Sequence, residues 1–151
     1  MKNIITTDNF KQTQKFGKKT AQEIIQKSKK FLEKKGAVVV GLSGDLGAGK
    51  TTFLQGFAEG LGIKEKILSP TFVILKHFKI KNSVFSDFYH IDCYRISKPE
   101  DILEIGFEKI ILENKNIVAI EWPEKIKKFL PRSFVKIKFK NVGFNKREIE
   151  K

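Results

Sequence analysis

The sequence predicts an α/β fold of three layers, in which helices cover both faces of a mixed, mainly parallel central sheet. Three observations predict it. A β-branched run at residues 37–42, typical of a strand buried on both faces, leads into a glycine-rich segment and then a helical pattern from Lys50 to about Gly60. A second buried strand is expected at residues 117–120. A polar turn at residues 81–82 joins two further strands into an antiparallel pair.

The other elements follow from periodicity and capping residues. After an irregular start, Asp8 or Asn9 is expected to cap a first helix that runs to about Lys34, and Gly36 ends it. The hairpin strands are expected at residues 71–80 and 83–89, short helices from Pro99 and at 108–112 and 126–130, and a half-exposed strand at 134–139. The polar end, residues 145–151, is expected to fray.

Length and composition limit the class of protein. The 151 residues fit one domain, 1–151, and the 40% apolar and 31% charged content excludes a disordered chain. No apolar stretch approaches the roughly 18 residues that span a bilayer, and no signal peptide is recognised, so the cytoplasm is the expected compartment. Cys93 is the only cysteine, which excludes an internal disulfide or a Cys-based zinc site.

The net charge of +13 creates a field that attracts phosphates, but only three of the 30 basic residues are Arg. Proteins that read nucleic-acid bases rely mainly on Arg. We therefore interpret most lysines as solvated surface, which is compatible with a partner that handles RNA but is not evidence of direct base readout.

One motif carries recognisable chemistry: Gly44-Asp45-Leu46-Gly47-Ala48-Gly49-Lys50-Thr51 matches G-x-x-x-x-G-K-[ST] in full. Glycines let the backbone bend around a phosphate chain, and the helix that follows directs its positive N-terminus at the same anion. We expect Lys50 to bridge the β- and γ-phosphates of a nucleotide, Thr51 to ligate Mg²⁺ and Thr52 to lie on the α-phosphate side. The motif therefore predicts a P-loop NTPase fold.

A P-loop enzyme also needs an acidic residue beside the metal, at the end of a second buried strand. Asp92 follows the strand expected at 83–89, and Glu121 follows the strand expected at 117–120. One of them is expected to hold Mg²⁺ or its water, and the other to orient the water that attacks the γ-phosphate. The sequence leaves this assignment open.

Four blocks together resemble a known family. They are, in chain order, residues 44–52, Ser69-Pro70-Thr71-Phe72, His90-Ile91-Asp92-Cys93-Tyr94-Arg95 and Glu121-Trp122-Pro123-Glu124. In this combination the chain is similar, over about residues 10–139, to the small bacterial P-loop ATPases of the TsaE (YjeE) family. The resemblance implies ATP binding and slow, partner-stimulated hydrolysis in the service of tRNA modification, the attachment of threonylcarbamoyl to an adenosine of the anticodon loop.

The same resemblance implies partners and site residues. The partners are TsaB and TsaD, with tRNA reached through their complex and with no membrane or DNA involved. Lys50 and Thr51 carry over as ligands of phosphate and Mg²⁺, and Asp92 and Glu121 as the acidic metal and water site. Thr71 carries over in a switch-like loop near the γ-phosphate, with Trp122 as a neighbouring wall of the ATP site. Residues 10–13 match the region near the base only loosely, and the C-terminal stretch is poorly matched, so no base contact is assigned to Arg132 or Arg147.

Two smaller signals and three competing functions remain. His90 is interpreted either as a structural histidine at a strand end or as the residue that orients the Asp92 carboxylate. Arg95 is interpreted as fixing its loop, as reaching a partner or, if it points at the γ-phosphate, as an arginine finger. The alternative function is a small P-loop kinase acting on a metabolite, although three unclustered Arg argue against the Arg-rich lid that such kinases use. A GTPase lacks the Asn-Lys-x-Asp element, and a passive RNA-binding module leaves the P-loop unexplained.

Overall fold

The computed structural model describes residues 2–68, 74–81 and 83–151. Its strands form one seven-stranded sheet in the order β1-β7-β6-β2-β5-β4-β3. The strands at the centre run parallel, namely β6 (Val135–Gly143), β2 (Val38–Ser43), β5 (Asn116–Glu121) and β4 (Asp87–Asp92). The outer strands β1 (Ile4–Thr7), β7 (Lys146–Glu150) and β3 (Leu75–Lys79) pair antiparallel. The predicted α/β fold with a mixed, mainly parallel sheet is confirmed, and the parallel pairs lie in the middle of the sheet.

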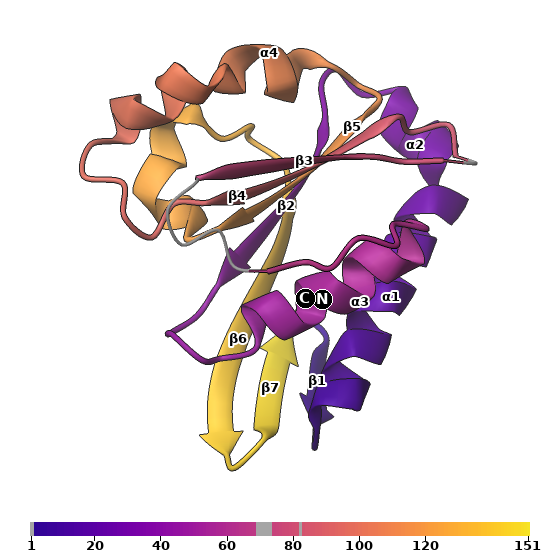
Figure 1. Cartoon of the computed structure of the whole chain (residues 1–151), viewed down its shortest axis with the longest axis vertical. Coiled ribbons are helices and arrows are strands. Elements are labelled where there is room, and N and C mark those ends of the chain that lie inside the picture. The colour runs from indigo at the N-terminus through magenta and orange to yellow at the C-terminus, as the bar shows by residue number, and fades with distance from the viewer. Residues whose placement is uncertain (1, 69–73, 82) are drawn as a thin grey trace.

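Helices cover both faces of this sheet, which gives the predicted three layers (Figure 1). One face carries α1 (Phe10–Gln26), α2 (Ser28–Leu32) and α3 (Lys50–Gly60). The other face carries the short 3₁₀ helices η1 (Pro99–Ile105) and η2 (Pro123–Phe129) together with α4 (Phe107–Leu112). The short helix expected at residues 126–130 corresponds to η2, which begins three residues earlier. It begins at a proline, a residue that suits the first position of a helix.

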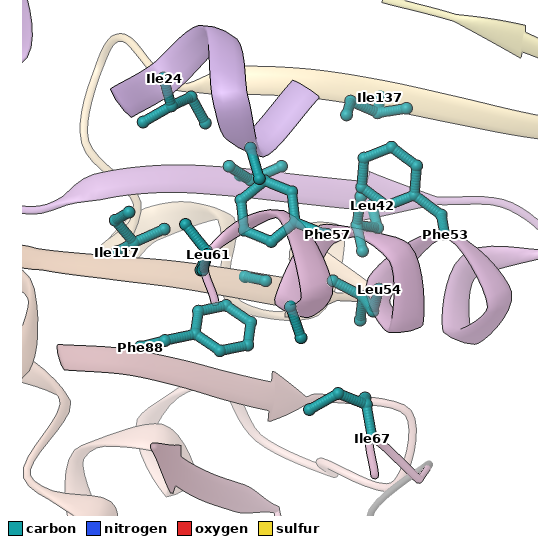
Figure 2. Close-up of a cluster of buried hydrophobic side chains, with 14 of the residues drawn as sticks. Ile24, Leu42, Phe53, Leu54, Phe57, Leu61, Ile67, Phe88, Ile117 and Ile137 are labelled. Atoms are coloured by element: carbon teal, nitrogen blue, oxygen red, sulfur yellow. The ribbon is translucent and has the colours of Figure 1, made fainter. Parts of the chain in front are cut away.

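The core lies mainly between α3 and the sheet. Figure 2 shows Phe53, Leu54 and Phe57 of α3 pointing toward apolar side chains of the strands, among them Leu42 and Ile137. These three α3 side chains are fully buried. Their burial orients α3 on the sheet and so fixes the direction of its N-terminus.

Helices α1 and α3 approach each other through glycines. A Cβ atom on Gly56 would lie 1.8 Å from the carbonyl oxygen of Gln14, and one on Gly17 would lie 2.0 Å from that of Phe53. Only glycine permits such backbone contact. The close approach brings the start of α1 beside the start of α3.

The first helix differs from its prediction at one end. Asn9 caps it as expected, because its side-chain oxygen accepts a 2.9 Å hydrogen bond from the Gln12 N–H. The helix does not run unbroken to Lys34, since Lys27 leaves helical geometry and α2 follows as a separate turn. No Gly or Pro marks this break.

Both chain ends form strands, so the predictions of an irregular start and a fraying tail are wrong. β7 pairs with β6 on one side and with β1 on the other, and Ile149 is fully buried. Asn3 and Lys151 exchange backbone hydrogen bonds of 3.1 and 2.9 Å, so the two ends lie side by side (Figure 1). Pairing on both sides satisfies the backbone of a strand whose side chains are mostly polar.

Candidate functional site

The glycine-rich loop connects β2 to α3, as the motif predicts. Gly44, Gly47 and Gly49 have φ values of +146°, +74° and +105°, which side-chain-bearing residues rarely adopt. A Cβ atom on Gly44 would also lie 2.6 Å from the carbonyl oxygen of Phe139. Glycine is therefore required both for the bend and for contact with β6.

The Lys50 side chain forms hydrogen bonds with the backbone of the glycine loop. Its Nζ donates to the carbonyl oxygens of Gly44 and of Asp45, the latter at 3.0 Å, and lies 4.5 Å from the centre of the Trp122 ring. The residue is only 5% exposed, and this burial lowers the pKa of its ammonium, against the opposing effect of Glu121, Asp92 and further nearby carboxylates. An ammonium has three donors, so one stays available for an anion.

The start of α3 supplies further donors. The first intrahelical bond runs from the Phe53 N–H to the Gly49 carbonyl oxygen, so the N–H groups of Lys50, Thr51 and Thr52 have no partner within the helix. These groups and the helix dipole favour a negative charge at this position. The loop and the helix start together form an anion cradle.

The two predicted carboxylates end neighbouring strands. Asp92 is the last residue of β4 and Glu121 the last of β5, and the parallel register pairs them directly. Glu121 is 3% exposed, whereas Asp92 is half-buried and accepts a 3.0 Å hydrogen bond from the Tyr94 N–H. The sheet register thus brings both acids to the same edge as the cradle.

Of the two interpretations of His90, hydrogen bonding to Asp92 is not what the structure shows, because the ring contacts Glu121. Its Nε2 lies 2.8 Å from Oε2 of Glu121, and both side chains are buried. Alternation along β4 directs His90 and Asp92 to the same face, and Glu121 is the acid whose side chain reaches the ring. Nδ1 of His90 has no hydrogen-bond partner among the described residues, so the Glu121 contact is what orients this ring.

Trp122 has a strained backbone. Its φ and ψ of +59° and +50° fall in the left-handed region, which costs a bulky residue roughly 1–3 kcal/mol. Its N–H donates to the Leu42 carbonyl oxygen at 3.1 Å, and the Tyr94 ring lies 5.2 Å from the indole. In this conformation the indole lies against the Lys50 ammonium.

The loop, the start of α3 and the strand ends border one cavity of about 610 Å³. Of the predicted site residues, the cavity is lined by Leu46, Gly47, Ala48, Gly49, Lys50, Thr51, Thr52, Asp92, Glu121 and Trp122. Gly44 and Asp45 contribute through the carbonyl groups that hold Lys50. Thr71, with Ser69, Pro70 and Phe72, lies outside the described residues.

Most of the residues on the other side of the cavity were not predicted from the sequence. Phe10 and Thr13 at the start of α1, which the family resemblance matched loosely, line it together with Asn145 and Arg147 of the C-terminal hairpin. Asn145 and Arg147 belong to no recognisable motif. They lie in a polar segment with one isoleucine, which by composition is typical of a fraying tail. Only the β6–β7 pairing brings them to the loop.

The oxygen atoms in the cavity suit Mg²⁺. The Thr51 hydroxyl and the carboxylates of Asp92 and Glu121 are hard ligands of the kind that this ion takes. Among the described residues, no group of three or more His, Cys, Asp or Glu could hold a metal ion without other ligands. This sparse set fits an ion that keeps several waters and binds partly through substrate phosphates.

Fold and site together define a P-loop nucleotide-binding protein of the α/β class. The family model described as "Threonylcarbamoyl adenosine biosynthesis protein TsaE" matches residues 7–149. The chain therefore belongs to the TsaE family.

Individual relatives agree with this membership. The tRNA threonylcarbamoyladenosine biosynthesis protein TsaE of Rickettsia typhi is 38% identical over 143 residues, which cover 94% of this chain and 89% of the relative. The protein of the same name from Treponema pallidum is 39% identical over 118 residues, 78% of this chain and 83% of its own. The crystal structure of Bacillus subtilis YdiB is similar with a TM-score of 0.73 and 31% identity, over 99% of this chain and 84% of that one.

The helices in the described part of the chain are too short or too polar to cross a lipid bilayer.

Proposed function

We propose that this protein binds Mg-ATP in the cavity over the glycine loop and hydrolyses it slowly, as a single-domain cytoplasmic accessory ATPase of tRNA threonylcarbamoyladenosine biosynthesis. The observation that carries the proposal is the Lys50 ammonium, held by two loop carbonyls inside a cavity that Asp92 and Glu121 also line. Family membership and the names of the relatives support the pathway.

The donors of the cavity match the charge of a triphosphate. The remaining Lys50 donor and the N–H groups at the start of α3 would bind the β- and γ-phosphate oxygens. The Thr51 hydroxyl and the Asp92 carboxylate would hold Mg²⁺, which when bound neutralises charge on the phosphates. The burial of Lys50 strengthens its own contact with a phosphate oxygen.

Glu121 is the better candidate for orienting water. A carboxylate has two oxygens, and His90 holds one of them at 2.8 Å. The other oxygen can accept a hydrogen bond from a water and aim it at the γ-phosphate. Asp92, which is half-buried, is then the metal ligand.

Slow hydrolysis by the isolated protein and stimulation by partners form the second part of the proposal. The partners are proteins of the TsaB and TsaD type, and tRNA joins through their complex. P-loop proteins often reach full rate only when a partner completes the site.

Two measurements test the proposal. Calorimetry with Mg-ADP and Mg-ATP at up to millimolar concentration is expected to show binding. The absence of any heat of binding would refute the nucleotide site. ATP hydrolysis is then measured for the protein alone, with TsaB and TsaD, and with or without tRNA. Stimulation by the partners supports the accessory role, whereas rapid phosphoryl transfer to a metabolite without partners would favour a kinase.

A further inference from the structure

The C-terminal hairpin, formed by β6 and β7, contacts the glycine loop. Nη2 of Arg147, in β7, donates to the carbonyl oxygen of Gly47 at 3.0 Å. The aliphatic part of the same side chain covers Gly49, where a Cβ atom would lie 3.5 Å from Cγ of Arg147. One side chain from the end of the sequence thus contacts two glycines of the loop.

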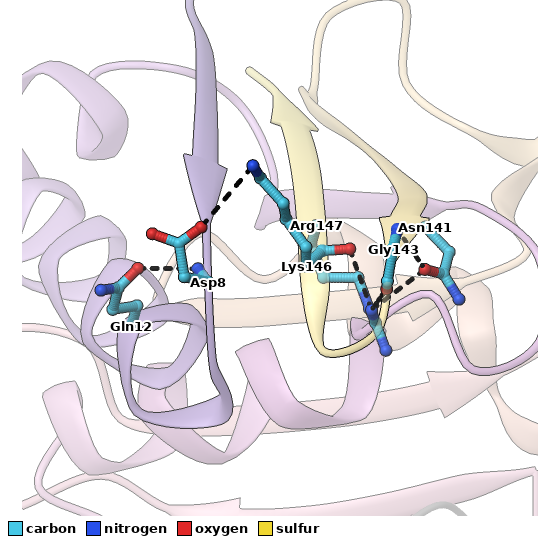
Figure 3. A network of polar contacts seen from close by, with 6 residues as sticks. All are labelled: Asp8, Gln12, Asn141, Gly143, Lys146 and Arg147. Carbon is cyan, nitrogen blue, oxygen red and sulfur yellow. Dashed lines mark hydrogen bonds and ion pairs between the residues drawn. The ribbon is translucent and has the colours of Figure 1, made fainter.

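Arg147 is itself fixed by the hairpin that carries it. Nη1 donates to Oδ1 of Asn141 at 3.2 Å and to the backbone oxygen of Lys146 at 3.0 Å, with the oxygen of Gly143 at 3.4 Å (Figure 3). Oδ1 of Asn141 also accepts from the Gly143 N–H at 3.2 Å, where the β6–β7 register shifts. The guanidinium that reaches the loop is therefore held by hydrogen bonds within its own hairpin.

The peptide that Arg147 touches is fixed at both ends. Its oxygen, on Gly47, accepts from Arg147, and its N–H, on Ala48, donates to the Asp45 carbonyl at 3.1 Å. The same Asp45 oxygen accepts from Nζ of Lys50 at 3.0 Å. A continuous series of hydrogen bonds thus runs from the hairpin through the loop turn to the lysine of the cradle.

We propose that Arg147 is a positioning residue that holds the glycine loop in its anion-binding shape, so that the C-terminal hairpin is part of the nucleotide site. The inference rests on the proposed function, because the bound anion is the phosphate chain of ADP or ATP. A planar fork with separate donors can reach Gly47 and Asn141 at once, whereas a lysine ammonium is a single point of charge. Geometry as well as charge is needed at this position.

Four variants separate these contributions. Arg147→Ala removes fork and charge, Arg147→Lys keeps the charge, and Asn141→Ala removes one support of the guanidinium. Lys146→Ala is the matched control, because it removes an equal charge from the same hairpin. Among the described residues, the Lys146 ammonium forms an ion pair only with Asp8, at 4.0 Å (Figure 3). For each, calorimetry gives the affinity for Mg-ADP, steady-state kinetics gives kcat and KM for ATP, and hydrogen exchange follows the Ala48 amide without nucleotide.

The expected result is a split between binding and turnover. Arg147→Ala and Arg147→Lys weaken Mg-ADP binding about tenfold and raise KM by a similar factor, while kcat changes by less than about threefold. Asn141→Ala shifts both quantities in the same direction by less. Exchange at Ala48 accelerates in all three variants, and Lys146→Ala behaves as the wild type.

Several results would overturn the inference: wild-type affinity in Arg147→Ala, full rescue by Arg147→Lys, or equal weakening by Lys146→Ala, which would reduce the effect to charge. If Arg147→Ala does not fold, Arg147→Lys and Asn141→Ala decide the question. If the wild type binds no nucleotide, the proposed function fails, and the exchange experiment still decides whether Arg147 holds the loop.

Discussion

The two walls of the cavity are built in different ways. The strand-end wall, made of Asp92, Glu121 and Trp122, continues directly from the parallel strands β4 and β5. The hairpin wall, made of Asn145 and Arg147, is half-buried and reaches the loop through side-chain hydrogen bonds. Backbone ladders thus carry both walls to the site, but at the hairpin wall one guanidinium makes the contact with the loop turn.

The two walls differ in what their side chains contribute: functional groups on the strand-end wall, and a contact that holds the loop on the hairpin wall. On the strand-end wall, replacing one side chain removes a functional group while the ladder keeps the backbone in place. On the hairpin wall, replacing Arg147 removes the contact that fixes the loop turn. We therefore expect substitutions on the first wall to lower turnover and those on the second to lower affinity.

The largest effect is expected at Lys50, which touches the loop and the strand-end wall together. Lys50→Ala is expected to weaken Mg-ATP binding by about 10²-fold or more, because charge-assisted hydrogen bonds to the phosphates are lost. Calorimetry measures the loss, and Lys66→Ala, which removes an exposed lysine, is the charge control. Unchanged binding in Lys50→Ala would remove the basis for the cradle.

Glu121→Gln tests the strand-end wall alone. The substitution keeps the size of the side chain and an oxygen that can face His90, but removes the negative charge that orients water. Turnover is expected to fall by about 10²-fold with Mg-ADP affinity nearly unchanged. Normal turnover would transfer the water-orienting role to Asp92, and Asp92→Asn is the variant to measure next.

A smaller effect is expected at His90, which acts only through Glu121. His90→Ala leaves Oε2 of Glu121 without this hydrogen bond, so turnover is expected to fall about tenfold while KM stays nearly constant. His77→Ala is the matched control, since His77 also contacts an acid, Asp87 at 2.6 Å, but lies outside the cavity. An equal loss in both variants would show a general effect on the sheet rather than on Glu121.

The smallest effect is expected at the opposite end of β4. Burial by itself would raise the pKa of Asp87, but hydrogen bonds from Lys79, His77 and Ser86 outweigh it and lower that pKa from 3.8 to about 2. A depressed carboxyl pKa stabilises the fold fully above the ordinary value, and this contribution is lost as the pH falls through about 2.

Asp87→Asn is therefore expected to lower the free energy of unfolding by about 1 kcal/mol at pH 7, and to reduce the acid sensitivity of stability between about pH 4 and 2. Urea denaturation across this range measures both effects. ATP turnover at pH 7 should stay at the wild-type level, because Asp87 does not line the cavity. A turnover loss would contradict the assignment of Asp87 to the fold rather than to the site.

The elements predicted well are those whose signals are local. Helix α3 begins at Lys50 and ends at Gly60 as predicted, because glycines bound an amphipathic run. β2 and β5 are recognisable as short apolar runs, since strands buried on both faces need them. β1 and β7 were missed because their stability comes from pairing with each other and with β6 rather than from their own composition.

The site divides in the same way. The residues of the glycine motif and the acids at strand ends could be named from the sequence, because strand, loop and helix follow one another directly. Their individual roles stay predictions, and Thr71 lies outside the described residues. The contact between His90 and Glu121 needs two strands in register, so spacing along the chain suggested the neighbouring Asp92 instead.

By itself, the sequence determined the α/β class, the anion-binding loop with its lysine, and the family, because each depends on residues that lie close together in the chain. Only the tertiary structure decided which side chains complete the cavity. Arg147 and Gly47 are 100 positions apart, and nothing local to either residue encodes their contact. The contact forms because strand pairing within the sheet places the C-terminal hairpin beside the loop. Long-range strand pairing is the part of folding that local patterns do not determine.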